Sequence, residues 1–131
     1  MIKDSGGKLK KFKEWNSLAP GIQGPSLFIW PVGMHGVLYP PHSLSEEALD
    51  EEIFMRLSPY SDETWAKAMS LLKKIECKKV SPFCPNYFHI RGVRGQSLNK
   101  INSTGTKDKQ IQAVFEYFNL YTVIGNSINH S

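Results

Sequence analysis

Two consecutive segments carry apolar residues at helical spacing, and this feature constrains the fold more than any other. The first set is Leu49, Ile53 and Leu57, and the second is Trp65, Ala68, Met69, Leu72 and Ile75. Each set falls on one face of a helix, and an amphipathic helix must bury that face against another element. Pro59 separates the two sets, because proline ends or kinks a helix at the residue before it. The sequence therefore predicts a hairpin of two helices, over residues 43–58 and 61–78.

The starts of both helices have recognisable capping residues. Ser43 and Glu46 have the spacing of a capping box, in which each side chain binds a free backbone N–H group of the first turn. Ser61 is placed to cap the second helix in the same way. On the polar face of that helix, Glu63 lies one turn before Lys67, so we expect the two to form an ion pair in solvent.

The rest of the chain predicts a small sheet and further helix. Aromatic and β-branched residues predict strands at 27–30, 37–39 and 87–90, and apolar spacing predicts a helix from Lys107 to about Tyr121. We therefore expect an α+β fold, with three or four helices packed on a two- or three-stranded antiparallel sheet. Residues 1–131 have the length of a single domain, with loose ends at 1–8 and 126–131. The predicted core is Leu27, Ile29, Leu49, Ile53, Leu57, Trp65, Met69, Leu72, Ile75, Ile90, Ile111, Val114, Phe115 and Phe118.

Charge is divided into blocks along this mildly basic chain, whose net charge is +4. Residues 1–15, 64–80 and 91–109 are each basic, whereas residues 43–63 hold seven acidic residues against one Arg. Such a run is typical of a solvated helix face, and it can also meet a basic partner. The residues that would make an acidic interaction face within the predicted helix at 43–57 are Glu46, Glu47, Asp50 and Glu51.

A basic glycine loop is the strongest candidate for binding an anion. Arg91 and Arg94 lie among glycines between a predicted strand and a possible helix, where backbone amides and Arg side chains can both reach a phosphate. Lys100, Lys107 and Lys109 follow in the sequence. The loop lacks the spacing of a Walker A or dinucleotide-binding motif, so it predicts only a general contact with nucleic acid or another anion.

The sequence offers no catalytic or cofactor motif. The cysteines and histidines have no zinc-ligand spacing, so we predict no metal and no cofactor. Cys84 and His89, five residues apart on an extended segment, would point to opposite faces. The aromatic residues early in the chain, among them Trp15 and Trp30, are expected in the core.

Export and membrane signals are also missing. No apolar run is long enough to cross a membrane, and residues 1–8 contain no apolar signal region. We therefore expect a cytoplasmic protein with Cys77 and Cys84 as free thiols.

Three classes of function remain open on this basis. The first is a non-catalytic binding module whose basic loop contacts nucleic acid or another anionic partner. The second is a protein-interaction module, such as an inhibitor, an immunity-type protein or a homodimer, that uses its acidic helix. A small enzyme without a recognisable motif is the third and least favoured.

Overall fold

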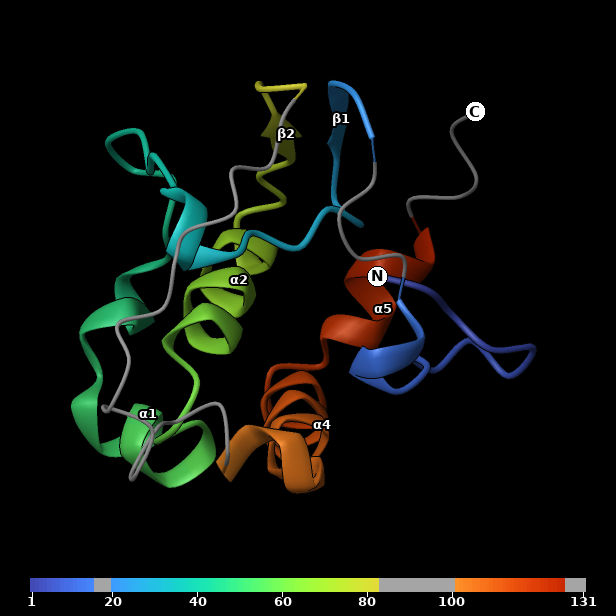
Figure 1. The fold of residues 1–131 in the computed structure, drawn as a ribbon. Helices are drawn as coiled ribbons and strands as arrows, with labels where there is room; N and C mark the ends of the chain where they lie inside the picture. Colours follow the sequence, from blue (N-terminus) through green and yellow to red (C-terminus); the bar gives the residue numbers. More distant parts are fainter. Residues whose placement is uncertain (16–19, 83–100, 127–131) are drawn as a thin grey trace, which may run out of the picture.

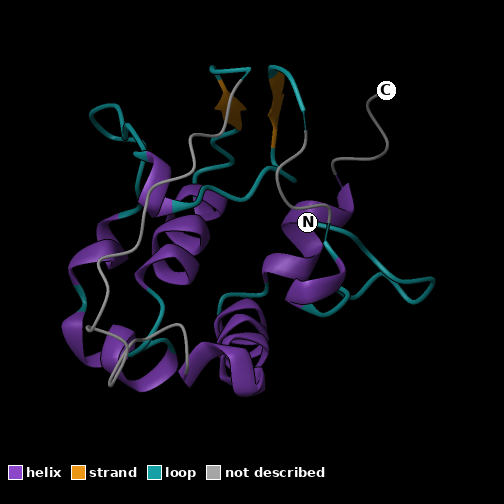
Figure 2. Ribbon diagram, in the orientation of Figure 1, coloured by secondary structure: helices purple, strands orange, loops and turns teal. Residues whose placement is uncertain are grey.

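The computed structural model describes residues 1–15, 20–82 and 101–126, and it confirms an α+β fold of helices with a small antiparallel sheet (Figures 1 and 2). The α-helices of these residues are α1 (Glu51–Leu57), α2 (Asp62–Leu72), α4 (Lys107–Tyr117) and α5 (Leu120–Asn126). Strands β1 (Gln23–Ser26) and β2 (Cys77–Lys79) form the sheet. Shorter helical turns are η1 (Phe12–Glu14), η2 (Gly33–His35), η3 (Glu46–Leu49) and η5 (Asn102–Thr106).

The predicted helical hairpin exists, but both of its helices are shorter than expected. The capping box at Ser43 does not form, because the chain makes the 3-10 turn η3 first and starts α1 afterwards. Asp50 is the N-cap of α1, and its carboxylate accepts a hydrogen bond from the backbone N–H of Ile53 at 2.9 Å. Ser61 caps α2 as predicted, accepting from the N–H of Thr64. Because Asp50 is a second capping residue inside the segment, the first predicted helix is divided into η3 and α1.

The second helix ends at Leu72 because the chain reverses there. Lys74 has a positive φ of 55°, which ends the helix, and the following residues form β2 instead of a further helical turn. The partner strand β1 precedes the strand predicted at 27–30, and Ser26 pairs with Cys77. The strand predicted at 37–39 does not form. The strand predicted at 87–90 lies outside the described residues.

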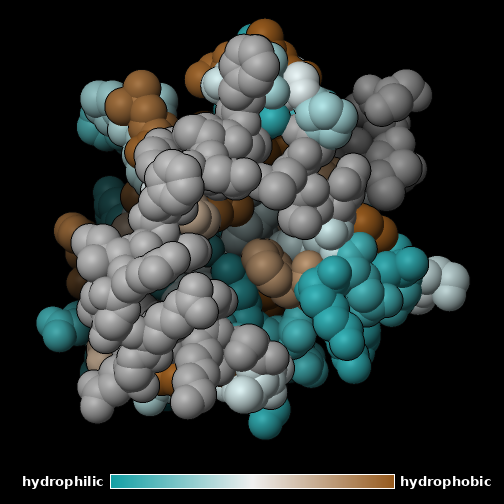
Figure 3. Space-filling view, viewed as in Figure 1, coloured by the Kyte–Doolittle hydropathy of each residue, from teal (hydrophilic) through white to brown (hydrophobic). Residues whose placement is uncertain are grey.

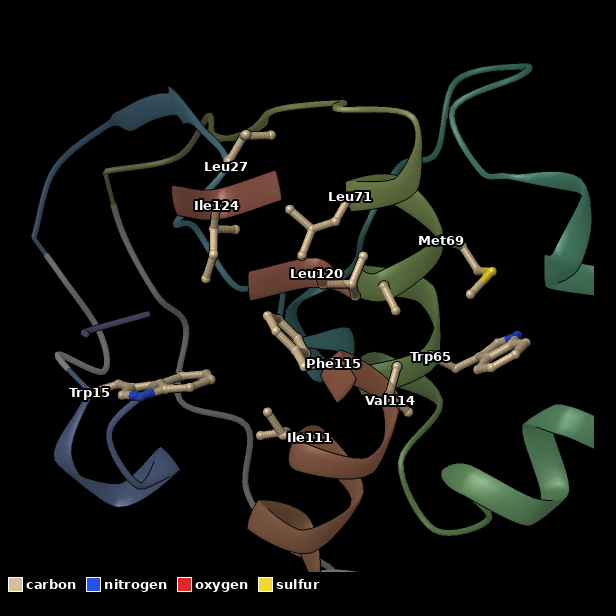
Figure 4. Packing of buried hydrophobic residues seen from close by; sticks show 11 residues of the cluster. Trp15, Leu27, Trp65, Met69, Leu71, Ile111, Val114, Phe115, Leu120 and Ile124 are labelled. Carbon is tan, nitrogen blue, oxygen red and sulfur yellow. The ribbon is translucent and has the colours of Figure 1, made fainter. Parts of the chain in front are cut away.

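Helix α2 is the centre of the core (Figure 4). Leu71 points from α2 toward Leu120 and Ile124 of α5, whereas Trp65 and Met69 point to the opposite side of the helix. On that side the indole Nε1 of Trp65 donates to the carbonyl of Ala48, and its ring contacts Phe54 with 5.5 Å between centroids. Helix α2 is thus covered by α4 and α5 on one side and by η3 and α1 on the other.

The predicted core is correct for the helices that meet α2 and wrong at two positions. Leu27, Trp65, Met69, Ile111, Val114 and Phe115 are buried, and Ile29, Ile53, Leu57, Leu72 and Phe118 are half-buried. Leu49 and Ile75 are exposed instead, Leu49 with 90% of its surface in solvent. Leu49 lies in the 3-10 turn η3 before α1 begins, and Ile75 follows the end of α2, so neither lies in the α-helix that the periodicity predicted. Ile90 lies outside the described residues.

The N-terminal segment packs against the last helices. Lys3 Nζ donates to the carbonyl of Ile124 at 2.8 Å, and the N–H of Phe12 donates to the carboxylate of Asp108 at 2.7 Å. The rings of Phe12, Trp15 and Trp30 form one cluster beside this contact, with centroids 5.0–6.1 Å apart. The expectation that the early aromatic residues lie in the core is therefore confirmed for Trp15, whereas Phe28 and Trp30 are half-buried and Tyr39 is exposed. In the described part of the chain, no helix has the length and hydrophobicity needed to cross a membrane.

Candidate functional site

A groove of about 510 Å³ lies where the loop after Trp30 crosses η3, α1 and the start of α2. Aromatic side chains from three elements contribute to its wall, namely Tyr39, Phe54 and Trp65. Every charged residue among the described residues that line it is acidic. The complete lining is Pro31, Gly33, Val37, Tyr39, Ala48, Leu49, Glu51, Phe54, Asp62, Glu63, Trp65 and Ala66.

Glu63 holds the loop in place over α2. One carboxylate oxygen accepts the backbone N–H of Gly33 at 2.8 Å, and the other accepts from Lys107 Nζ at 2.9 Å. Lys107 also lies 4.0 Å from the centre of the Phe12 ring, a cation–π contact. The loop, α2, α4 and the N-terminal segment are therefore joined through one ion pair. Glu63 has both oxygens occupied, so Glu51 and Asp62 are the groove's acids with free capacity.

The field at the groove is negative. Burial raises the pKa of Tyr39 above its ordinary value of 10.0, and Cys77, Asp62 and Glu63 raise it further through their electrostatic effect. Burial alone raises the pKa of a phenol, so the negative charge of the groove follows from its acidic lining residues Glu51, Asp62 and Glu63. The first turn of α2 supplies Asp62 and Glu63, where acidic residues also suit the positive end of the helix dipole.

The predicted acidic face lies beside this groove. Glu46, Glu47 and Glu51 are exposed, and Glu47 accepts a hydrogen bond from the hydroxyl of Ser45. Asp50 is half-buried and is occupied as the N-cap of α1. Leu49 stands exposed between these carboxylates at the edge of the groove. Leu49, which sequence periodicity placed in the core, is therefore an exposed leucine beside acidic side chains.

Of the five predicted anion-binding residues, the structure describes two. Lys107 is paired with Glu63, and it is therefore not free to bind an external anion. Lys109 is exposed. Arg91, Arg94 and Lys100 lie outside the described residues.

Exposed lysines gather in a different place, on the N-terminal segment. Lys8, Lys10, Lys11 and Lys13 are all exposed, and the segment forms a hydrophilic patch at the lower right of Figure 3. The hydrogen bond from Phe12 to Asp108 brings Lys11 and Lys13 close to the residue before Lys109. Lys11 and Lys13 also line a polar cleft of about 840 Å³ with Lys107. The acids Asp62, Glu63 and Asp108 line that cleft too, so its charges are balanced.

Lys67 is the functional group that the sequence misplaced most clearly. We expected it in solvent beside Glu63, yet its side chain is fully buried and Glu63 pairs with Lys107. The Nζ atom of Lys67 donates to the Sγ atom of Cys77 at 3.5 Å. Cys77 is a free thiol, as predicted. The contact joins α2 to β2 across a chain reversal, so neither residue carried a local signal of it.

Comparison with known proteins identifies no relative. No protein-family model, no curated protein and no solved structure matches the chain. Within the described residues, no three His, Cys, Asp or Glu side chains lie close enough to hold a metal ion.

Proposed function

We propose that this protein is a small non-catalytic binding module of the cytoplasm, whose groove binds a lysine or arginine side chain from a basic segment of a partner protein. The observation that carries this proposal is the lining of the groove, in which aromatic rings meet acidic residues and no described cation intrudes. The free thiol of Cys77 is consistent with a reducing compartment.

Physical chemistry favours a cation in such a groove over a neutral or anionic group. A guanidinium or ammonium group over an aromatic face gains about 0.5–2 kcal/mol, depending on how fully it is desolvated. Glu51 and Asp62 are exposed, so an ion pair with either contributes about 0.2–1 kcal/mol. Because association itself costs free energy, one inserted side chain gives weak binding, and the apolar contact next to it has to add to the affinity.

Leu49 supplies an apolar contact at the edge of the same site. An exposed leucine beside a pocket is suited to pack on an apolar residue of the partner, and the surrounding carboxylates suit a polar rim. The proposed partner segment thus has one basic side chain for the groove and an apolar residue next to it. This proposal keeps the protein-interaction function that we expected of the acidic helix. It differs in that the binding site is the groove and not the whole acidic face.

The test uses two blocked peptides that differ in one group. One peptide carries a central arginine beside leucine, and the other carries citrulline, which has the same shape without the charge. Binding is followed by NMR, through the indole signal of Trp65 and the ring signals of Tyr39 and Phe54. We expect the arginine peptide to shift these signals and the citrulline peptide to bind about tenfold more weakly or not at all.

Variants then separate the groove from general attraction to acidic protein. The double substitution Glu51→Gln and Asp62→Asn should abolish the preference for arginine. Glu116→Gln, which changes an exposed acid of α4 outside the groove lining, should retain it. Equal binding of both peptides, or shifts confined to another surface, would exclude the proposed function.

A second candidate is the binding of nucleic acid or another anion, and it is favoured by the exposed lysines beside Lys109. Affinity for a polyanion comes from released counterions, so each phosphate contact adds to the dependence of binding on salt. Replacing Lys11, Lys13 and Lys109 by Ala, or Arg91 and Arg94 by Ala, should weaken oligonucleotide binding and flatten its salt dependence. Absence of binding at low salt would remove this candidate.

A further inference from the structure

A buried lysine and a cysteine meet between α2 and β2, outside the groove lining. Lys67 has none of its surface in solvent, and its Nζ atom donates to the Sγ atom of Cys77 at 3.5 Å. Cys77 is half-buried, whereas Lys67 is enclosed, so Cys77 is the residue of the pair that is partly exposed to solvent. Among the residues that the structure describes, Cys77 is the hydrogen-bond partner of the Lys67 amine.

Burial favours the neutral amine of Lys67 over its ammonium form. Burial lowers the pKa of Lys67 below its ordinary value of 10.5, and the contact with Cys77 opposes that shift. Without the sulfur, an ammonium ion in this position would lack a partner of opposite charge, which is costly in a protein interior. A proton that leaves the thiol for the amine creates an ammonium–thiolate pair and satisfies both groups.

We propose that Cys77 is a site of covalent oxidation by hydrogen peroxide, with Lys67 as the base that takes the thiol proton. An adjacent base is a general means of activating a nucleophile, and the thiolate is the form of cysteine that reacts. The base and the thiol are already within contact distance, so the reaction needs no rearrangement of the chain.

The chemical step balances with peroxide as the sole co-reactant. The thiol proton passes to Nζ of Lys67, and the thiolate attacks one oxygen of hydrogen peroxide. The S–O bond forms while the O–O bond breaks, so sulfur is oxidised to the sulfenic acid and peroxide is reduced. The departing hydroxide takes the proton back from the Lys67 ammonium and leaves as water.

Few other titratable groups bear on the pair. Tyr39 lies close enough for Cys77 to influence its pKa, and Lys67 helps to lower the pKa of the Met1 amino group to about 6, after the larger effect of burial. A tyrosine that keeps its own proton does not take one from the thiol, and an amino group with a pKa of about 6 is only a weak base toward it. Lys67 is therefore the group that decides the reactivity of Cys77.

The experiment measures oxidation of Cys77 in the full chain with Cys84→Ser, which leaves a single thiol. Hydrogen peroxide is added at pH 7, the sulfenic acid is trapped with dimedone, and the product is followed by mass spectrometry. We expect Lys67→Met and Lys67→Gln to slow the reaction about tenfold, because neither side chain accepts a proton. Lys73→Met, which removes an exposed lysine of the same segment, should retain the original rate.

A second measurement covers the case in which the Lys67 variants do not fold. The rate of the protein that retains Lys67 is compared at about pH 6 and about pH 8, folded and in denaturant, where a free thiol speeds up strongly as it ionises. We expect a distinctly flatter dependence in the folded protein. Equal rates in folded Lys67 variants, or equal steepness in the folded and denatured chains, would overturn the proposal.

Discussion

Helices α1 and α2 lie next to each other and carry similar apolar patterns, but they have opposite surroundings. Helix α2 is buried over most of its length, with Ala68, Met69 and Leu71 fully enclosed. Neither α1 nor the turn η3 before it contains a single buried residue. Apolar spacing thus shows which face of a helix can be buried. The number of elements packed around the helix decides whether that face is buried. Helix α2 has neighbours on two sides and α1 has them on one.

The difference has a consequence for function. Side chains of η3 and α1 that face α2, such as Ala48 and Phe54, complete the wall of the groove. Leu49, at the edge of the groove, and Met55 remain exposed to solvent. A thin outer layer of this kind leaves apolar and acidic residues exposed, and the enclosed layer beneath supplies the stability.

The largest expected effect is the loss of a ring from the enclosed layer. Phe115 of α4 has no exposed surface and contacts Tyr121 with 5.4 Å between ring centroids. Phe115→Ala should lower the free energy of unfolding by about 3–5 kcal/mol, measured by urea denaturation. Tyr117→Ala, which truncates an exposed ring of the same helix, is the control and should cost far less. Similar costs for the two would show that the division into layers is wrong.

The ion pair between Glu63 of α2 and Lys107 of α4 comes next in size. Glu63→Ala removes the acceptor of both Gly33 and Lys107, so we expect a loss of about 2 kcal/mol. A double-mutant cycle with Lys107→Met should show that the two substitutions are not additive. Asp62→Ala, at the neighbouring exposed position, should cost a few tenths of a kcal/mol. Additive effects would mean that Glu63 and Lys107 do not stabilise each other across α2 and α4.

Substitution of the N-cap residue tests whether helix α1 begins after Asp50. Asp50→Ala should cost about 1 kcal/mol and speed hydrogen exchange in α1, with little change in α2. Ser43→Ala should cost little, because the hydroxyl of Ser43 is buried with no hydrogen-bond partner among the described residues. If Ser43→Ala proved the more harmful of the two, the capping box expected from the sequence would be the real start of the helix.

The smallest expected effect is a change in how stability depends on pH. Because burial lowers the pKa of Lys67, the unfolded chain binds more protons than the folded protein between that lowered value and 10.5. Stability therefore rises as pH rises through this interval. Lys67→Met should remove that part of the rise, and Lys73→Met should keep it. Parallel pH curves for the original protein and Lys67→Met would contradict a penalty for the buried amine.

The sequence could predict those features that depend on residues close together in the chain. Ser61 caps α2 because the residues it needs lie within one turn, and Trp65 and Met69 are buried because the helix face repeats regularly. The division of the first helix followed from a competition between two possible caps, Ser43 and Asp50, which the pattern alone does not decide.

The functional residues were harder to predict because distant segments determine them. Lys67 has the spacing of a solvent-facing residue, and only the strand β2, folded back after Lys74, brings Cys77 to it. The groove likewise combines a loop, a helical turn and two helices. No local motif marks Tyr39, Glu51 and Trp65 as one site. The acidic block at residues 43–63 indicated only that a surface formed by this segment would carry negative charge.

Two leucines test the contrast between the layers most directly. Leu71 of α2 has none of its surface exposed, and Leu49 of η3 has 90% exposed. Urea denaturation of Leu71→Ala and Leu49→Ala compares the same change of side chain in the two places. We expect Leu71→Ala to lower the free energy of unfolding by about 2–5 kcal/mol and Leu49→Ala to change it by less than about 0.5 kcal/mol. A loss of more than about 1.5 kcal/mol for Leu49→Ala would show that this leucine belongs to the core and would leave no free apolar contact beside the groove.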